Sequence, residues 1–254
     1  MRSYAQYCPI AKASEILGDR WTLLIVREML SEVRGFNELH RGLPGISRSV
    51  LTDRLRSLER AEIVERRTGP KGKTLKYRLT PAGRDLGPVV QAIGEWGATW
   101  SFTDPRPEEL DPDLLIVWMA RHVDREQLPA DRTVVQFDFR HPAKRYWMVL
   151  EPSDVSVCLQ HPGFDVDLEV KVDTATLYRV YLGRAELGGA MRGRKLTMRG
   201  PQALQRAFGR WFAWSSFAPA SRSADERRRA AFRLASPDRV RIDETLQRYR
   251  RRGG

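Results

Sequence analysis

The stretch from Gly35 to Arg78 constrains the fold more than any other part of this chain, because several local patterns follow one another there in a fixed order. Apolar residues first recur at helical spacing from Phe36 onward. The pair Pro44-Gly45 then breaks this helix, since proline and glycine together favour a turn. A short helix followed by a tight turn is therefore predicted.

A second helix is predicted directly after this turn. Ser47 stands where an N-cap is needed, because its hydroxyl can accept a hydrogen bond from an unpaired backbone N–H. Leucines then recur at helical spacing and define one buried face, at Leu51, Leu55 and Leu58. The opposite face and its flank are polar throughout, and they carry Arg48, Ser49, Thr52, Asp53, Arg56 and Arg60.

Two short β-type runs, Ile63–Arg67 and Leu75–Leu79, come next and are joined by a turn rich in Gly and Lys. Helix, turn, helix and hairpin is the order of a winged helix, in which the second helix enters the major groove and the hairpin tip reaches phosphates. Each part alone is typical of an ordinary packed helix or a solvated turn. Their ordered combination predicts DNA binding.

The expected DNA contacts fall into two groups. Polar side chains on the second helix are expected to read base edges, and they are Ser47, Arg48, Ser49, Thr52, Arg56 and Arg60. Lys71 and Lys73, near the hairpin tip, are expected to neutralise phosphates instead.

Charge is distributed unevenly along the 254 residues, whose net charge is +12. Residues 1–103 carry +6, residues 104–221 are neutral and residues 222–254 carry another +6. A chain of this length fits two domains, and an excess of positive charge favours a polyanionic partner. We therefore predict a winged-helix domain at 1–103, a second domain at 104–220 and a basic extension at 221–254.

Composition argues against several other classes of protein. The two cysteines, Cys8 and Cys158, imply no disulfide framework, and no apolar run approaches a membrane span or a signal peptide. The four histidines have no metal-ligand spacing, and neither a phosphate-binding loop nor a nucleophile elbow is present. A cytoplasmic protein that is not an enzyme, with no metal, no cofactor and no membrane partner, is expected.

Residues 4–100 resemble the HxlR family of bacterial transcription regulators. The resemblance rests on Cys8-Pro9, Gly18-Asp19-Arg20-Trp21-Thr22, Phe36-Asn37-Glu38-Leu39, Pro44-Gly45-Ile46-Ser47, Leu51, Arg54-Leu55, Leu58 and Leu79-Thr80-Pro81 with Gly83. It implies a dimeric winged-helix protein that binds operator DNA and usually represses. This chain departs from the family at residues 31–34, where a glycine-containing turn is usual.

Three further features of the N-terminal half carry predictions. Asp19 is expected to cap a helix, and Thr80 to cap another that Pro88 interrupts. An apolar stripe beyond it predicts a homodimer contact, through Val89, Val90, Ile93, Trp96 and Trp100. Cys8 precedes a helix, where backbone dipoles favour a thiolate, and in some members of the family a cysteine here senses oxidants. Cys8 is thus either a redox sensor or a small packed residue.

A Pro- and acid-rich linker at 101–112 leads into a second domain. Helices are expected at 114–123, 174–181, 185–191 and 201–214, and strands at 134–139, 146–150, 155–159, 166–172 and 195–198. This pattern predicts an α+β domain with a mainly antiparallel sheet. Beyond it, residues 222–252 indicate a charged helix with two arginine triplets, which is either solvated or in contact with DNA phosphates.

The second domain resembles sterol carrier protein type 2-like domains. The resemblance rests on Asp167, Glu169, Lys171, Asp173-Thr174, Gly183, Ala190-Met191, Gly193, Lys195-Leu196 and Gly200. It implies a fold that encloses an apolar tunnel for a lipid-like ligand, with no contact residue assigned. The aromatic side chains exceed what a sheet of this length needs, so they are expected to line the wall of an apolar cavity, and the alternative is that they simply fill a core. These residues are Trp118, Phe137, Phe139, Trp147, Phe164, Phe208, Trp211, Phe212 and Trp214.

The chain is thus expected to be a homodimeric regulator, most often a repressor, that binds double-stranded DNA and carries an effector-type domain. A lipid carrier localised by its DNA-binding half is the alternative, and a nonspecific basic chromatin protein is a third.

Overall fold

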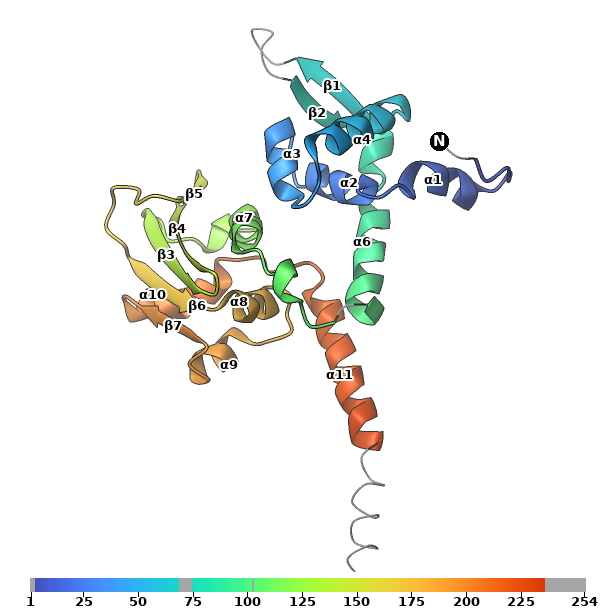
Figure 1. The fold of residues 1–254 in the computed structure, drawn as a ribbon. Helices are drawn as coiled ribbons and strands as arrows, with labels where there is room; N and C mark the ends of the chain where they lie inside the picture. The colour runs from blue at the N-terminus through green and yellow to red at the C-terminus, as the bar shows by residue number, and fades with distance from the viewer. Residues whose placement is uncertain (1–2, 69–74, 102, 236–254) are drawn as a thin grey trace, which may run out of the picture. The chain divides into compact units, whose positions relative to one another are not determined.

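The computed structural model describes residues 3–68, 75–101 and 103–235 (Figure 1). It divides into two compact units, Met1–Gly94 and Glu95–Gly254, and each unit has its own hydrophobic core. The predicted basic extension is described only as far as residue 235, and residues 236–254 lie outside the description.

The first unit contains the predicted sequence of helix, turn, helix and hairpin. Its elements are α1 (Pro9–Leu17), α2 (Thr22–Leu30), α3 (Phe36–Gly42), α4 (Arg48–Arg60), β1 (Val64–Thr68), β2 (Leu75–Leu79), α5 (Pro81–Arg84) and α6 (Gly87–Trp96), the last of which ends in the second unit. β1 and β2 pair antiparallel, from Val64 opposite Leu79 to Thr68 opposite Leu75. The winged-helix prediction is confirmed.

The start of α2 differs from the prediction. Asp19 does not cap this helix, because its carboxylate is paired with the guanidinium of Arg54 on α4. The N-cap position is taken by Trp21, which has a left-handed backbone (φ 78°) and makes no side-chain cap. Asp19 therefore joins the connection between α1 and α2 to α4, and this contact spans 35 residues of sequence.

The segment where the family usually carries glycine keeps a glycine-like turn. Glu32 has φ 62°, in the left-handed region that favours glycine. The next residue, Val33, is buried, and the carbonyl of Arg34 accepts a hydrogen bond from the N–H of Tyr77 at 2.8 Å. The turn is thus held from both sides despite the absence of glycine.

The core of the first unit lies between α2, α3, α4 and the hairpin. Ile25, Leu39, Leu51 and Leu55 are at most 1% exposed. A buried carboxylate, Glu28 of α2, also lies in this region and accepts two hydrogen bonds from Arg27, at 2.8 and 3.3 Å.

Gly42, the last residue of α3, lies directly against this buried carboxylate. A Cβ atom at position 42 would stand 2.1 Å from Oε2 of Glu28, closer than any real contact. A side chain at position 42 would therefore require the carboxylate of Glu28 to shift.

The break between α5 and α6 agrees with the prediction at Thr80 and Pro88. The hydroxyl of Thr80 accepts a hydrogen bond from the N–H of Gly83 at 3.1 Å, so Thr80 caps α5. α5 ends at Arg84, and α6 begins at Gly87 with Pro88 in its first turn. A proline is tolerated there because the first N–H groups of a helix have no intrahelical partner.

The second unit is an α+β fold. After η1 (Gly97–Ser101) and η2 (Pro107–Glu109), its elements are α7 (Pro112–Arg121), η3 (Arg125–Gln127), β3 (Thr133–Arg140), β4 (Ala143–Leu150), β5 (Val155–Cys158), β6 (Leu168–Val172), α8 (Thr174–Tyr181), α9 (Leu187–Arg192), β7 (Leu196–Arg199), α10 (Gln202–Ala207), η4 (Phe208–Arg210) and α11 (Ala218–Ala235). The predicted helix at 201–214 was too long, since α10 stops at Ala207 and a 3₁₀ turn follows.

The five strands form one sheet in the order β5-β4-β3-β6-β7. The predicted mainly antiparallel sheet is corrected to a mixed sheet, because β3 and β6 run parallel, with Val135 opposite Leu168. The pairs β3·β4, β4·β5 and β6·β7 are antiparallel. The mixture arises because the chain leaves β5 at one edge and returns beside β3 instead of extending that edge.

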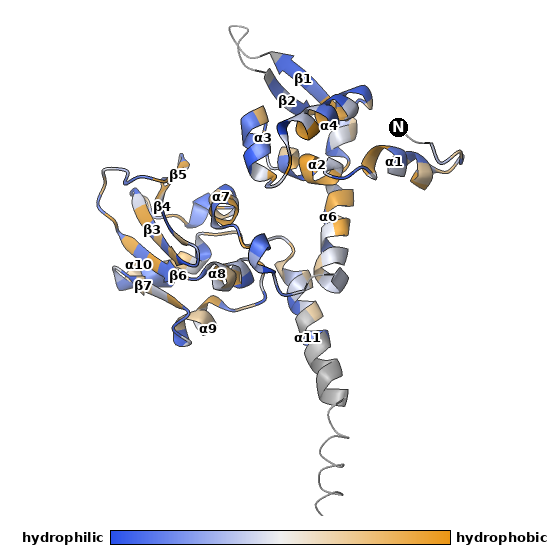
Figure 2. Cartoon of the chain, viewed as in Figure 1, coloured by the Kyte–Doolittle hydropathy of each residue, from blue (hydrophilic) through white to orange (hydrophobic). Residues whose placement is uncertain are grey.

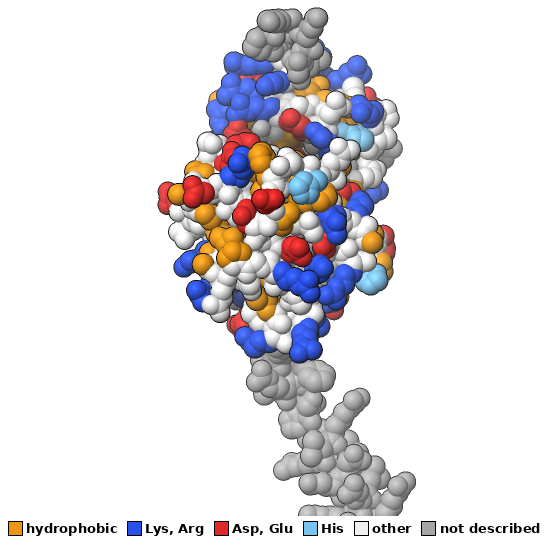
Figure 3. All heavy atoms as spheres, turned by 90° about the vertical axis from the view of Figure 1, so that its left-hand side faces the viewer, with side chains coloured by type: hydrophobic (Ala, Val, Ile, Leu, Met, Phe, Trp, Pro, Cys, Tyr) orange, Lys and Arg blue, Asp and Glu red, His pale blue; other side chains and the backbone are white. Residues whose placement is uncertain are grey.

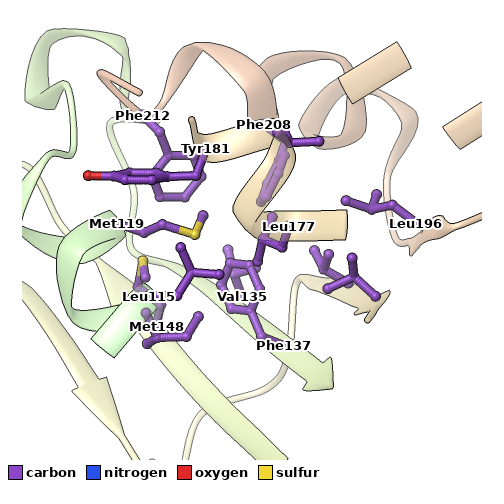
Figure 4. Packing of buried hydrophobic residues seen from close by; sticks show 14 of the residues in the cluster. Leu115, Met119, Val135, Phe137, Met148, Leu177, Tyr181, Leu196, Phe208 and Phe212 are labelled. Carbon is purple, nitrogen blue, oxygen red and sulfur yellow. The ribbon is translucent and has the colours of Figure 1, made fainter. Parts of the chain in front are cut away.

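Helices α7 and α8 pack their apolar side chains on the sheet. Figure 4 shows Leu115 and Met119 of α7 and Leu177 of α8 gathered over Val135 and Phe137 of β3. At the start of α7, the hydroxyl of Tyr146 donates to Oδ1 of Asp113 at 2.6 Å, and burial together with this carboxylate raises the pKa of the Tyr146 hydroxyl. The helix is thereby fastened to β4.

Candidate nucleic-acid interface

The turn between α3 and α4 sets the position of the second helix. Gly45 has φ 86°, which glycine adopts without strain, and the chain then enters α4 through Ser47. The hydroxyl of Ser47 accepts a hydrogen bond from the N–H of Val50 at 3.2 Å, as the sequence predicted. α4 then follows its leucine pattern, with Leu51, Leu55 and Leu58 at most 2% exposed.

The polar residues of α4 are turned away from this buried face. Exposed side chains among the predicted contacts are those of Ser47, Arg48, Ser49, Arg56 and Arg60. Thr52 is half-buried, and its hydroxyl donates to the carbonyl of Arg48 at 2.8 Å. One helix thus presents a row of hydroxyl and guanidinium groups to its surroundings, and these groups can hydrogen-bond base edges.

Local contacts at the start of α4 orient some of these groups. A guanidinium N–H of Arg48 donates to Oδ1 of Asn37 at 3.1 Å, and the guanidinium carbon lies 5.7 Å from the centre of the Phe36 ring. The hydroxyls of Ser47 and Ser49 are 3.0 Å apart. Arg48 is therefore held against α3.

Arg56 is held far more loosely. Its guanidinium is 3.9 Å from the carboxylate of Asp53, and the two side chains are 69% and 73% exposed. Such an exposed pair contributes little to stability, so it can be exchanged for another acceptor. Arg60 donates to the hydroxyl of Ser57 at 3.2 Å.

The hairpin adds cations that the motif-based prediction missed. Lys71 and Lys73 lie outside the described residues. Arg67 on β1 lies opposite Lys76 on β2, and Glu65 lies opposite Arg78. These four residues are on the face of the hairpin opposite to buried Tyr77. Figure 2 shows the hydrophilic character of this hairpin. Alternation of Lys76, Tyr77 and Arg78 along β2 was the signal for this exposed basic face.

Comparison with known proteins matches the same part of the chain. A family model described as HxlR-like helix-turn-helix matches residues 16–104. The uncharacterized HTH-type transcriptional regulator YvaP of Bacillus subtilis is 36% identical over 105 residues, which are 39% of this chain and 97% of YvaP. The chain belongs to the HxlR-like helix-turn-helix family.

Two further matches cover a similar part of the chain. The uncharacterized HTH-type transcriptional regulator Rv3095 of Mycobacterium tuberculosis is 41% identical over 102 residues, which cover 39% of this chain and 61% of Rv3095. The solved structure of the reduced form of the transcriptional regulator YodB from B. subtilis is 33% identical, with a TM-score of 0.34, and covers 37% of this chain and 95% of that chain.

Membership in the HxlR-like family confirms the predicted DNA-binding helix-turn-helix. The family match ends at residue 104. The sterol-carrier-like resemblance of the second unit therefore stays a prediction, as do the exact domain boundaries. Among the described residues, no helix is long and apolar enough to cross a membrane.

Cys8 of the HxlR-like domain stands at the N-cap of α1. Its thiol is half-buried, and its carbonyl accepts a hydrogen bond from the N–H of Lys12 at 3.0 Å. Cys158 is half-buried on β5. Within the described ranges, no group of three or more His, Cys, Asp or Glu residues is arranged to hold a metal ion.

In the second unit, most of the conspicuous aromatic residues pack against one another. The ring centre of Phe208 lies 6.1 Å from that of Phe137, 5.9 Å from that of Trp211 and 5.2 Å from that of Phe212. Two of the predicted wall residues lie elsewhere. Trp147 faces the other side of the sheet and donates to Gln136 at 3.1 Å, while Phe164 is 40% exposed beneath Arg132.

Proposed function

We propose that this protein is a transcription repressor that binds operator DNA as a homodimer. The observation that carries this proposal is the division of α4 into a buried leucine face and an exposed face of Ser49, Arg56 and Arg60. In a winged helix this second helix lies in the major groove, where guanidinium and hydroxyl groups distinguish base pairs.

Different side chains take different parts in DNA binding. Arg56 and Ser49 read bases, because they are exposed and Arg56 has only a loose partner. Arg48, held by Asn37 and Phe36, binds a phosphate at the start of the helix. Arg67, Lys76 and Arg78 on the hairpin bind phosphates together with the predicted contacts Lys71 and Lys73.

The homodimer is proposed to form through the exposed apolar residues of α6. Val89, Ile93 and Trp96 are 41%, 48% and 62% exposed, and they follow one another at helical spacing. A continuous apolar stripe of this kind marks an interaction surface, and a second copy supplies an identical stripe.

Selection of genomic fragments by the full-length protein, followed by footprinting, tests the proposal. Protected sites should be inverted repeats with half-sites about one helical turn apart, because the reader has two-fold symmetry. A reporter fused to such a site should be less active when the protein is present. Protection without sequence preference would instead indicate a nonspecific basic chromatin protein.

A second candidate function concerns an apolar, lipid-like ligand in the second unit. The indole N–H of Trp211 is buried among the described residues and has no hydrogen-bond partner. A buried donor left unpaired costs about 1–3 kcal/mol, so an acceptor such as a ligand carbonyl would be favoured there. This observation supports the predicted effector role and, equally, the alternative of a carrier module.

Lipid extraction from the purified full-length protein tests this second function, together with titration of fatty acyl and sterol probes. Trp211→Phe keeps an aromatic ring and removes the donor, so it should weaken probe binding if the indole contacts the ligand. Trp214→Phe is the matched control, because the indole of Trp214 already donates to Gly209 at 3.0 Å. No bound lipid and no probe binding would leave the aromatic residues as core packing.

Cys8 is proposed as a redox-sensitive residue, since its thiol is partly exposed at the start of α1. Cys8→Ser should keep DNA affinity under reducing conditions and abolish the decrease in affinity that diamide or a quinone causes in the wild type. Cys158→Ser is the control. Equal responses of wild type and Cys8→Ser would assign Cys8 to packing.

A further inference from the structure

The neutral charge of residues 104–221 hides two stretches of opposite sign. Residues 104–186 contain 16 acidic and 10 basic residues, a net charge of −6. Residues 187–221 contain six basic residues and no acidic residue, a net charge of +6. The six are Arg192, Arg194, Lys195, Arg199, Arg206 and Arg210, and we call them the basic edge.

The first half of the basic edge is a tight turn that leads into the edge strand of the sheet. α9 ends at Arg192, and the N–H of Lys195 donates to the carbonyl of Ala190 at 2.9 Å. Arg194 has a left-handed backbone, with φ 55°. Ala190 and Leu196 anchor this turn in the core, while the three cations between them are exposed.

The second half follows the same division between core and surface. Arg199 ends β7, which lies at the edge of the five-stranded sheet. Phe208, fully buried, then faces the core, and Arg206 and Arg210 on either side of it are exposed. The buried residues of this segment therefore fix its backbone and leave its cations in solvent.

The cations of the basic edge have no acidic partners within the described part of the chain. No ion pair there joins any of the six to a carboxylate, whereas Arg106, Arg132 and Arg145 elsewhere in the unit each have one. Figure 3 shows Lys and Arg side chains grouped at more than one place on the face that is turned to the viewer, with Asp and Glu side chains nearby. A surface that concentrates cations without neutralising them attracts polyanions.

We propose that the basic edge is a second contact surface for double-stranded DNA and that it binds backbone phosphates. Five of its six cations are arginines, whose planar guanidinium groups match phosphate oxygens in pairs. The helix-turn-helix keeps DNA at high effective concentration for any second site on the same chain. The remainder of this segment, residues 104–186, carries a net charge of −6 and therefore attracts phosphates less than the basic edge does.

This inference rests on DNA binding by the first unit. The basic edge adds affinity for DNA without distinguishing between base sequences. The test uses full-length protein and two duplexes, one with the selected site and one of random sequence, between about 50 and 200 mM salt. Arg194→Gln with Lys195→Gln should lower the salt slope by about 0.9 for each phosphate that is no longer bound, on both duplexes alike. Arg206→Gln with Arg210→Gln should do the same from a different element.

Arg106→Gln with Arg132→Gln is the matched control, because it removes the same charge from cations that already have acidic partners. It should leave the slope unchanged. All variants should melt at the wild-type temperature, since the replaced side chains are exposed. An equal change of slope in control and test variants, or no change in either, would overturn the proposal.

Two further measurements separate this proposal from its alternatives. Phosphatidylserine vesicles serve as a competing anionic surface, and a double variant that no longer binds vesicles but keeps its DNA slope would assign the edge to membranes. Failure of the wild type to select any site would refute the operator-binding proposal itself. Selective binding with an unchanged slope in the double variants would refute the basic edge alone.

Discussion

Helices α4 and α6 both carry apolar residues at helical spacing, yet the two sets have different surroundings. The leucines of α4 are buried within the first unit, and its polar side chains are exposed. The apolar residues Val89, Ile93 and Trp96 of α6 are largely exposed. The same periodicity therefore marks a core face in one helix and an uncovered face in the other, and only the packing of neighbouring elements distinguishes them.

The difference teaches where each helix obtains its stability. α4 is held by contacts inside one chain, so its orientation is fixed before DNA arrives. The exposed apolar stripe on α6 contributes no hydrophobic stabilisation within the isolated chain. It stabilises the protein only when another surface buries it away from water. Substitutions in the two helices should accordingly respond differently to protein concentration.

The largest effect is expected from Leu55→Ala on α4. Removal of a side chain that is 1% exposed should lower the free energy of unfolding by about 2–5 kcal/mol at every protein concentration. Ile93→Ala on α6 should cost less than about 0.5 kcal/mol in dilute protein and more when the dimer is populated. Urea unfolding over a range of concentrations measures both, and equal, concentration-independent decreases would remove the contrast between the helices.

Trp96→Ser should weaken self-association without unfolding the chain. Removal of a large aromatic side chain from an interface costs about 2 kcal/mol or more, which corresponds to a roughly thirtyfold increase in the dimer dissociation constant. Sedimentation velocity measures this change, and the exposed residue Gln202 on α10 offers a neutral control as Gln202→Ser. A protein that is monomeric before any substitution would refute the dimer proposal.

Arg56→Ala should weaken discrimination between the selected site and variants with single base changes. Removal of a bidentate hydrogen bond to a base costs about 1–3 kcal/mol at the base pair it reads, with little effect elsewhere. Competition binding against a panel of single-base variants identifies this position. Arg54→Ala is not a suitable control because Arg54 is paired with Asp19, whereas Arg41→Ala on α3 replaces an exposed cation. A uniform decrease in affinity over all sequences would make Arg56 a phosphate contact.

The smallest effect is expected from Ser47→Ala, which removes the cap of α4. The N–H of Val50 would be left without its side-chain acceptor, and stability should fall by about 1 kcal/mol. Ser47→Asp retains an acceptor and should restore most of this stability. Thermal unfolding measures both variants, and a failure of Ser47→Asp to recover stability would show that the hydroxyl acts through Ser49 instead.

Features set by neighbouring residues were predictable from the sequence. Ser47 and Thr80 cap the helices that follow them, Gly18 ends α1, and the Leu pattern identifies the buried face of α4. The exposed set on α4 followed from the same pattern, apart from half-buried Thr52. Caps, breakers and periodicity act within one or two turns, so they need no knowledge of the rest of the fold.

Features that depend on distant partners were not predictable. Asp19 precedes a helix, where an Asp commonly acts as the N-cap, but its carboxylate pairs with Arg54 instead. The parallel pairing of β3 with β6 joins strands that two other strands separate in sequence. Trp147 was grouped with the core aromatics, although it faces the opposite side of the sheet. In each of these cases, the residues nearby in sequence are compatible with both the predicted and the observed structure.

The close approach of Gly42 to Glu28 constrains the order in which these two positions can change. A side chain at 42 would require the buried carboxylate to move and to give up its present hydrogen bonds. A smaller residue at 28 would remove the obstacle, at the expense of the hydrogen bonds from Arg27. The effect of replacing Gly42 therefore changes with the residue at 28, as expected for two neighbouring residues. Replacement of Gly42 should therefore be better tolerated in a chain whose residue 28 has a shorter side chain.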